Sequence, residues 1–430
     1  MWALIDCDNF FCSCERVFRP ELEGRAIVVL SNNDGCVVAR SKEAKAMGIR
    51  MGIPYYQMRE QFPGADIVAF SSNYVLYADM SARVQAVLKA EAPVVHQYSI
   101  DEAFLDLSGM DRFNLKQWGE QLSAKVYKWT GIPISIGIAK TKTLAKVAVR
   151  YAKKYPGYKK CCFIETEEQR YKALKHFDIE DIWGVGRRHA RSMRAFGINT
   201  AHDFTMKSRS WVRKYYTVTG ERTWDELWGH DVIEVDSMDR KKQSIVTSRT
   251  FPGMISNEAE LAVHVSNYAA RCALKLRKQN SVCSMVTVYA RTNPFREDLP
   301  QYSGHATHIF STPTATTSEI VMAAKLMLHE FYRPGIKFKK AGVMVDRISS
   351  AFAYQPDLFE FDPCRRKKHD SISAVSDIIN GRLGNDTLIL AAQQYDGKRD
   401  DGKSHKFSDA IKRDMKSPDY STCLDAFKLK

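Results

Sequence analysis

The sequence predicts a multidomain α+β protein. Strand-like and helix-like segments alternate over residues 1–164, residues 165–230 are mostly helix-like, and a second β-α-β pattern occupies 243–346. Strands that alternate with helices indicate layers of sheet and helix rather than a helical bundle. At 430 residues, and with roughly 100–200 residues per domain, three or four domains are expected.

The first strand-like segment is short, apolar and interrupted by an acid. Trp2–Ile5 stops abruptly at Asp6, the β-rich stretch 93–107 carries further acids, and the strand-like segment 132–138 is followed by a helix expected over 141–154.

The last third of the chain has its own pattern. Three strand-like segments at 247–251, 284–292 and 341–349 are separated by helix-like segments at 257–278 and 317–332. The charged linker near 236–243 precedes them, and hydrophobic periodicity weakens beyond Ala351. We therefore expect a small separate α+β domain, with residues 363–430 as a loosely folded extension.

The net charge of +14 at pH 7 and the isoelectric point near 9.2 are the strongest bulk properties. Such an excess is typical of proteins that bind polyanions, because lysine and arginine release counterions from phosphates. A merely basic protein is the alternative on charge alone.

The sequence also favours one compartment. No stretch approaches the roughly 20 apolar residues of a membrane span, and the N-terminal segment has no basic region typical of a signal peptide. The ten cysteines form no Cys-x-x-Cys pair, so neither a zinc site nor a disulfide scaffold is expected. We expect a cytoplasmic protein with reduced thiols and no membrane contact.

Three carboxylates are candidates for a metal site. Asp6 ends an apolar strand, and Asp101 and Glu102 lie inside the apolar run 98–104. Buried carboxylates need cations or strong donors, and several oxygen ligands suit Mg²⁺. Neighbours on a regular strand point to opposite faces, so joint use of Asp101 and Glu102 requires a kink. The alternatives are strand caps or salt bridges to arginine.

A basic helix is predicted next to these acids. Lys142, Lys146, Arg150 and Lys153 fall at i, i+4, i+8 and i+11, which is one helical face. Such a face could neutralise a triphosphate or a DNA backbone, although a solvated charged face is commoner.

Two further motifs carry weaker signals. Gly184-Val-Gly186-Arg187-Arg188 predicts a turn between helices whose N–H groups could hold a DNA phosphate, and a helix C-cap is the alternative. The pair Phe10-Phe11 either packs in the core or places one ring against a sugar or base.

Long motifs along nearly the whole chain resemble the Y-family translesion DNA polymerases, and among them the UmuC branch. They are DCDNFF at 6–11, SNNDGCVVARSKEAKAMGIRMGIP at 31–54, FSSNYVLYADMS at 70–81, YSIDEAF at 98–104, GIAKTKTLAKVA at 137–148, DIWGVGRR at 181–188, TSRTF at 247–251 and SPDYST at 417–422.

The resemblance implies a right-hand polymerase with palm, fingers, helical thumb and α+β little finger. The implied domains are a palm of 1–11 and 79–164, fingers of 12–78, a thumb of 165–236 with a helix-hairpin-helix turn, a little finger of 243–346 and a C-terminal extension of 347–430. The implied activity is template-directed, error-prone translesion synthesis in an SOS-type DNA damage response. A two-metal nuclease or integrase and a catalytically inactive DNA-binding accessory factor are the alternatives.

The resemblance also assigns residues. Asp6, Asp101 and Glu102 match the catalytic ligands of two Mg²⁺ ions, with the carbonyl of Cys7 as a further ligand, and Phe11 matches the aromatic gate that excludes the ribose 2′-OH. The other implied nucleotide-binding residues are Phe10, Arg40, Lys45 and Lys153. The implied DNA-binding residues are Lys142, Lys146, Gly184, Gly186, Arg187, Arg188 and Arg249. The gate is Phe where the UmuC branch has Tyr, and Asp8 replaces an Asn.

The implied partners are primer-template DNA, dNTPs, a processed UmuD-like homodimer, a RecA filament and a sliding clamp. Gln355, Leu358 and Phe359 resemble the family's clamp-binding peptide. An extended segment with two apolar anchors can insert into an apolar groove. A polar loop without a partner is the alternative.

Overall fold

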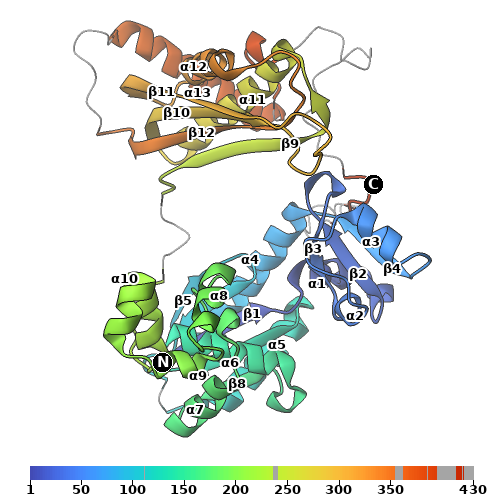
Figure 1. The fold of residues 1–430 in the computed structure, drawn as a ribbon, viewed down its shortest axis with the longest axis vertical. Helices are drawn as coiled ribbons and strands as arrows, with labels where there is room; N and C mark the ends of the chain where they lie inside the picture. Colours follow the sequence, from blue (N-terminus) through green and yellow to red (C-terminus); the bar gives the residue numbers. More distant parts are fainter. Residues whose placement is uncertain are drawn as a thin grey trace. The chain divides into compact units, whose positions relative to one another are not determined.

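The computed structural model describes residues 1–110, 112–235, 241–353, 362–384, 386–394, 413–418 and 420. The chain forms two compact units, Met1–Arg240 together with Lys412–Lys430, and Lys241–Ile411 (Figure 1). Each unit has its own sheet and its own buried core. This confirms the prediction of a multidomain α+β protein.

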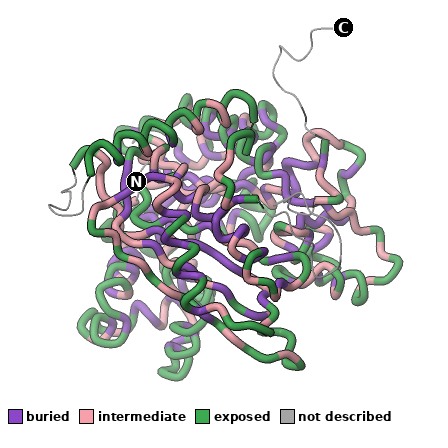
Figure 2. Tube along the Cα trace, turned by 90° about the horizontal axis from the view of Figure 1, so that it is seen from above, coloured by how far each residue is buried: buried purple, intermediate pink, exposed green. Residues whose placement is uncertain are grey.

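A five-stranded sheet forms the centre of the first unit. In spatial order its strands are β5 (Val94–Gln97), β6 (Glu102–Asp106), β1 (Trp2–Cys7), β7 (Ile134–Ala139) and β8 (Cys161–Ile164). The pair β7–β8 is parallel and the other neighbours are antiparallel. The central strands are largely buried because helices cover both faces of the sheet. Buried and exposed stretches alternate along the whole chain (Figure 2).

The two helix layers determine which way each strand residue faces. The covering helices are α4 (Tyr74–Glu91), α5 (Leu115–Thr130) and α6 (Lys142–Lys154). Ile5 packs in the core formed with α4 and α5, whereas Leu4 packs in the core formed with α6. Side chains alternate along a strand, so Asp6 shares the face of Leu4 and lies on the α6 side.

Helix α6 approaches the sheet most closely at Gly137. A Cβ atom there would lie 2.2 Å from the carbonyl oxygen of Ala145 and 2.3 Å from the amide nitrogen of Val149. Only glycine permits this approach of the two backbones. The contact brings the lysines of α6 over the ends of β1 and β6.

The rest of the first unit comprises a small sheet and a helical segment. The small sheet has the order β3 (Val37–Arg40), β2 (Ala26–Leu30), β4 (Ile67–Ser71), with α1 (Phe10–Val17), α2 (Lys42–Ala46) and α3 (Tyr55–Gln61) around it. The helical segment contains α7 (Glu167–Lys175), α8 (Arg187–Ala195), α9 (Ala201–Thr205) and α10 (Arg209–Leu227). Short 3-10 turns lie at Pro20–Leu22, Asn32–Asp34, Pro156–Tyr158 and Ile179–Asp181.

The second unit has four antiparallel strands and two packed helices. The spatial order is β11 (Ser303–Thr314), β10 (Ser281–Arg291), β12 (Phe338–Ser350) and β9 (Ile245–Ile255), with α11 (Glu258–Lys278) and α12 (Thr317–Phe331) packed on the sheet. The sequence predicted three of these strands and missed β11. Its polar, His- and Thr-rich pattern reflects an edge strand with one face exposed.

The expectation of a loosely folded extension is wrong for the first part of 363–430. Residues Pro363–Leu383 form helix α13, followed by a 3-10 turn at Ala391–Gln393. Arg277 pairs with Asp377 at 2.7 Å, and Arg366 pairs with Glu319 at 3.0 Å. The long helix was hidden because it is held by ion pairs and exposes several apolar side chains, which blurs its periodicity.

Among the described residues, no helix is long and apolar enough to cross a membrane.

Candidate active site

The three predicted carboxylates converge at one end of the central sheet. Asp6 on β1 lies directly opposite Glu102 on β6 in the antiparallel register. The Cys7 amide donates a 2.9 Å hydrogen bond to the carbonyl of Asp101, so Asp101 sits at the same end of the sheet. The chain bends at 99–101 just before β6 begins, which provides the break in strand geometry that adjacent acids require.

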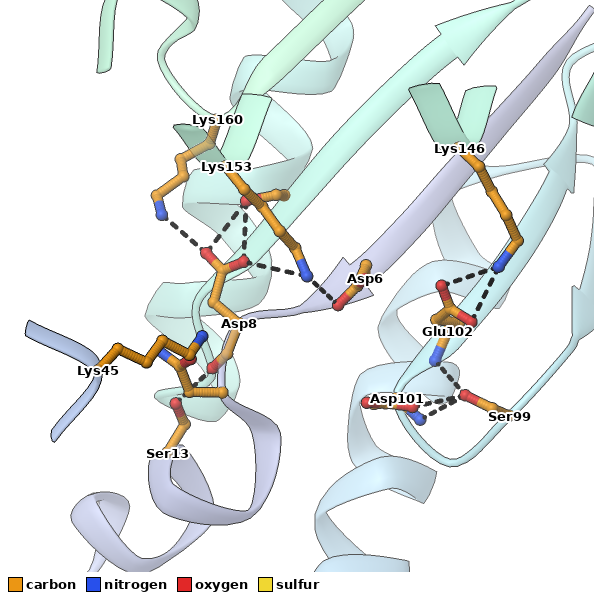
Figure 3. A network of polar contacts seen from close by, with 12 residues as sticks. Asp6, Asp8, Ser13, Lys45, Ser99, Asp101, Glu102, Lys146, Lys153 and Lys160 are labelled. Carbon is orange, nitrogen blue, oxygen red and sulfur yellow. Dashed lines mark hydrogen bonds and ion pairs between the residues drawn. The ribbon is translucent and has the colours of Figure 1, made fainter. Parts of the chain in front are cut away.

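Each carboxylate has its own polar partner (Figure 3). Lys153 Nζ lies 2.5 Å from Asp6 Oδ1, and Lys146 Nζ lies 3.0 and 3.1 Å from the two oxygens of Glu102. Ser99 Oγ donates to Asp101 Oδ1 at 2.5 Å and accepts the Glu102 amide at 2.9 Å. Ser99 therefore orients the Asp101 carboxylate and holds the backbone at Glu102, a role that the sequence analysis missed.

The electrostatics favour binding of a cation. The pKa of Asp6 is raised to about 6. Burial raises it most, Lys153 lowers it, and the charges of Glu102 and Asp101 raise it. Burial also raises the pKa of the Cys7 thiol well above its usual value. A neutral thiol is a poor ligand, so the hard oxygen donors of this site suit Mg²⁺ better than a soft metal. In the described part of the chain, no three His, Cys, Asp or Glu side chains are already grouped as a metal cluster.

A basic cavity of about 690 Å³ lies beside Asp8 and Asn9. The lysines that line it are Lys42, Lys45, Lys153, Lys159 and Lys160. Lys160 Nζ lies 2.7 Å from Asp8 Oδ2, and Asp8 also accepts a hydrogen bond from Ser135 Oγ at 2.9 Å. The structure thus brings predicted Lys45 and Lys153 together and adds Lys160, whose position after a turn gave no sequence signal.

The two adjacent phenylalanines have different environments. Phe11 is half-buried and stacks on Tyr77 with ring centroids 4.4 Å apart. Phe10 is only 4% exposed and belongs to the core of the first unit. Successive residues of a helix point in different directions, and Phe10 points inward. Its assignment as a nucleotide-binding residue stays a prediction. Arg40 lies on β3 and donates to the carbonyl of Ile49.

The basic stripe of α6 is not one exposed face. Lys142 is 4% exposed, pairs with Asp231 at 2.5 Å and lies over the Trp2 ring. Its assignment as a DNA contact stays a prediction. Arg150 pairs with Asp181, and Lys146 is occupied by Glu102. Helical spacing predicted a shared face, but it could not show that acids from four other segments would meet it.

The predicted turn before α8 has the expected conformation. Gly184 has φ +90°, a region that favours glycine, and Gly186 directly precedes α8. Arg187 and Arg188 are exposed at the start of that helix. In the second unit, half-buried Arg249 lies on β9. The predicted clamp residues Gln355, Leu358 and Phe359 lie outside the described residues.

The fold matches that of solved Y-family DNA polymerases. The structure resembles a Y-family DNA polymerase chimera of Dbh and Dpo4 with a TM-score of 0.66, at 20% identity over 81% of this chain and 99% of that one. It also resembles Dbh DNA polymerase in an insertion ternary complex with a TM-score of 0.53, at 20% identity and the same coverage.

The sequence comparisons identify the branch. The impB/mucB/samB family matches residues 5–150, and the C-terminal domain of that family matches 242–358. The chain is 40% identical to Protein UmuC of Salmonella typhimurium over 98% of both chains, and 41% identical to Protein ImpB of Salmonella typhimurium over 88% of this chain and 90% of that one. The chain belongs to the impB/mucB/samB family of Y-family DNA-directed DNA polymerases. This membership favours a polymerase over the nuclease and accessory-factor alternatives.

Proposed function

We propose that this polymerase performs error-prone translesion synthesis by two-metal phosphoryl transfer from a dNTP to the primer 3′-OH. The observation that carries the proposal is the strand register: Asp6 faces Glu102, and Asp101 is bonded through its backbone to Cys7. Carboxylates brought together by register on a sheet form a rigid oxygen-rich site.

Asp6, Asp101 and Glu102, with the carbonyl of Cys7, would hold two Mg²⁺ ions. Such ions stabilise the charge that develops on the attacking and leaving oxygens during in-line transfer. The protein's own contribution is positioning. Ser99 holds Asp101, as its 2.5 Å hydrogen bond supports.

The neighbouring cations and aromatic ring would hold the nucleotide. Lys45, Lys153 and Lys160 line one cavity and can bind the triphosphate. Arg40, on β3 of the small sheet, would also contact the nucleotide. Phe11 would pack against the sugar and exclude a 2′-OH.

The remaining assignments concern DNA and domains. We propose that Gly184, Gly186, Arg187 and Arg188 bind a DNA phosphate. Lys142 and Lys146 in the first unit and Arg249 in the second unit would also bind DNA. The domains would be the palm (1–11 and 79–164), fingers (12–78), thumb (165–236), little finger (243–346) and extension (347–430). The compact unit of 241–411 supports a separate C-terminal domain, and this unit also contains helix α13 of the extension.

The metal site is tested by replacing one ligand at a time. Asp101→Asn and Glu102→Gln should reduce nucleotide addition by at least about 100-fold, since loss of one interaction with developing charge costs about 3 kcal/mol or more. DNA binding in a gel-shift assay should persist. Extension at a near wild-type rate by either variant would contradict the assignment.

We further propose that the polymerase acts in an SOS-type response with a processed UmuD-like homodimer, a RecA filament and a sliding clamp. The clamp assignment is testable by itself: Leu358→Ala with Phe359→Ala should weaken clamp binding by about 2 kcal/mol or more per anchor. Distributive extension of a short primer should not change. Equal clamp affinity in a titration would remove this peptide from the proposal.

A further inference from the structure

The C-terminal segment packs against the first unit. Through a series of side-chain contacts it is connected to Phe11. Ser417 is 4% exposed, its Oγ donates to Glu15 Oε1 at 3.2 Å, and it accepts from Asn73 Nδ2 at 3.0 Å. Ser417 and Glu15 are 402 positions apart in the sequence. In the sequence, all residues of the second unit come between these two positions.

Glu15 also contacts Tyr77 and so connects it to Ser417. Glu15 and Tyr77 are fully buried, and Tyr77 OH donates to the same oxygen, Glu15 Oε1, at 2.7 Å. The other oxygen, Oε2, is buried and has no hydrogen-bond partner among the residues that the structure describes. Burial of a carboxylate carries a desolvation cost. The described hydrogen bonds of the Glu15 side chain that offset this cost come from Tyr77 and Ser417.

Tyr77 in turn supports the ring of Phe11. The two rings are stacked with centroids 4.4 Å apart and planes 15° apart. Tyr74 lies edge-on to both rings, at 6.0 Å from Phe11 and 6.1 Å from Tyr77. Phe11 therefore rests on a platform whose hydrogen bond fixes the plane of Tyr77.

Several contacts anchor the C-terminal segment. Met415 N donates to Ser71 Oγ at 3.0 Å, and Ser71 N donates to the carbonyl of Met415 at 3.0 Å. Tyr420 stacks on Phe18 with centroids 4.4 Å apart and planes 7° apart. The segment thus docks through backbone pairing, an aromatic stack and Ser417 together.

We propose that Ser417, Glu15 and Tyr77 are positioning residues for Phe11, so that the docked C-terminal segment determines how strictly ribonucleotides are excluded. A steric gate distinguishes a hydroxyl from a hydrogen only if its ring is held within a fraction of an ångström. The proposal rests on the proposed role of Phe11 as the sugar gate.

The test measures the ratio of kcat/KM for rNTP to kcat/KM for dNTP in the full-length chain. Tyr77→Phe and Ser417→Ala each remove one hydrogen bond and should raise the ratio by about threefold to tenfold. Ser417→Asp places a second acid against Glu15 and should raise the ratio further and speed hydrogen exchange in 413–420. Phe11→Ala should raise it most.

Matched variants separate positioning from general loss of stability. Tyr151→Phe removes a tyrosine hydrogen bond to the carbonyl of Ala173 elsewhere in the unit and should leave the ratio unchanged. Glu15→Gln keeps an oxygen acceptor and should stay near the wild-type ratio, whereas Glu15→Leu should raise it.

The outcomes are distinct. A wild-type ratio for both Tyr77→Phe and Ser417→Ala, with an increased ratio for Phe11→Ala, overturns this inference and leaves the gate in place. An unchanged ratio for Phe11→Ala overturns the gate and this inference together. An equal rise in Tyr151→Phe would show that the effect is not specific and would also overturn it.

Discussion

Adjacent residues of this polymerase have different environments and different partners. Phe10 packs in the core while Phe11 is half-buried on Tyr77. Asp101 is oriented by Ser99 while Glu102, the next residue, pairs with Lys146. The direction of each side chain, which a helix or a strand end determines, decides these roles more than residue type does.

Glu15 gives a prediction for stability at this scale. Burial raises its pKa, while the bonds from Tyr77 and Ser417 lower it. The folded protein therefore binds a proton more tightly than the unfolded chain, whose glutamate pKa is near 4.5. Stability must then fall as pH rises from that value through the folded-state value.

We expect Glu15→Gln to stabilise the protein at pH 7.5 by about 1–3 kcal/mol, because the buried charge is removed. The gain should shrink as the pH is lowered towards 4.5, because the raised pKa lets the folded wild-type carboxyl take up a proton before the unfolded chain does. Thermal melts at both pH values check this. A gain that grows on acidification would refute the argument.

At the scale of the element, helix α6 positions the lysines that pair with the acids of the candidate site. Its close approach at Gly137 brings Lys146 and Lys153 onto the acids of β6 and β1. Lys146 also lies 4.5 Å from the Tyr98 ring centroid and 5.2 Å from that of Trp183, which immediately precedes the Gly184 turn. One helix therefore links the central sheet to the helical segment.

Lys146→Met should separate metal binding from catalysis. Removing a positive charge 3.0 Å from Glu102 should tighten binding of Mn²⁺, used as a probe, by about fivefold or more. Extension should slow because Glu102 loses its orienting partner. Mn²⁺ titration by electron paramagnetic resonance and single-turnover extension measure the two effects.

The matched control is Lys125→Met. Lys125 also pairs with an acid, Glu91, and lies 4.7 Å from the Trp129 ring centroid, but on α5. It should change neither quantity. Weaker Mn²⁺ binding in Lys146→Met would show that the lysine supports the metal site instead of competing with the ion.

At the scale of the whole molecule, the net charge of +14 does not form a uniform surface. Many cations are individually paired, as Arg194 is with Asp178 and Glu180. Exposed Arg187 and Arg188 begin the helix after the Gly184 turn. A few such sites, not the total excess, should govern DNA affinity.

Arg187→Ala with Arg188→Ala should lower the slope of log K against log salt by about two, since each phosphate contact contributes about 0.9. The KM for dNTP at saturating DNA should not change. Arg194→Ala, whose cation is already paired, should leave the slope near wild type. Equal slopes for all three proteins would place the DNA elsewhere.

The sequence by itself determined the α+β class, most of the strands and helices, the three acids, the glycine turn and the family. These are local signals: apolar periodicity, acids inside strand-like runs and long ordered motifs. It missed β11 and helix α13 because an edge strand and an ion-paired helix lack a clear apolar period.

Tertiary structure alone decided which side chains meet. Lys142 is buried against Asp231 and Trp2, Lys160 joins the basic cavity through Asp8, and Ser417 bonds to Glu15 across 402 positions. Such pairs depend on how distant segments pack, and no local pattern encodes the partner of a charged or buried group. That is why the acids could be predicted from the sequence, whereas their counterions and the support of Phe11 could not.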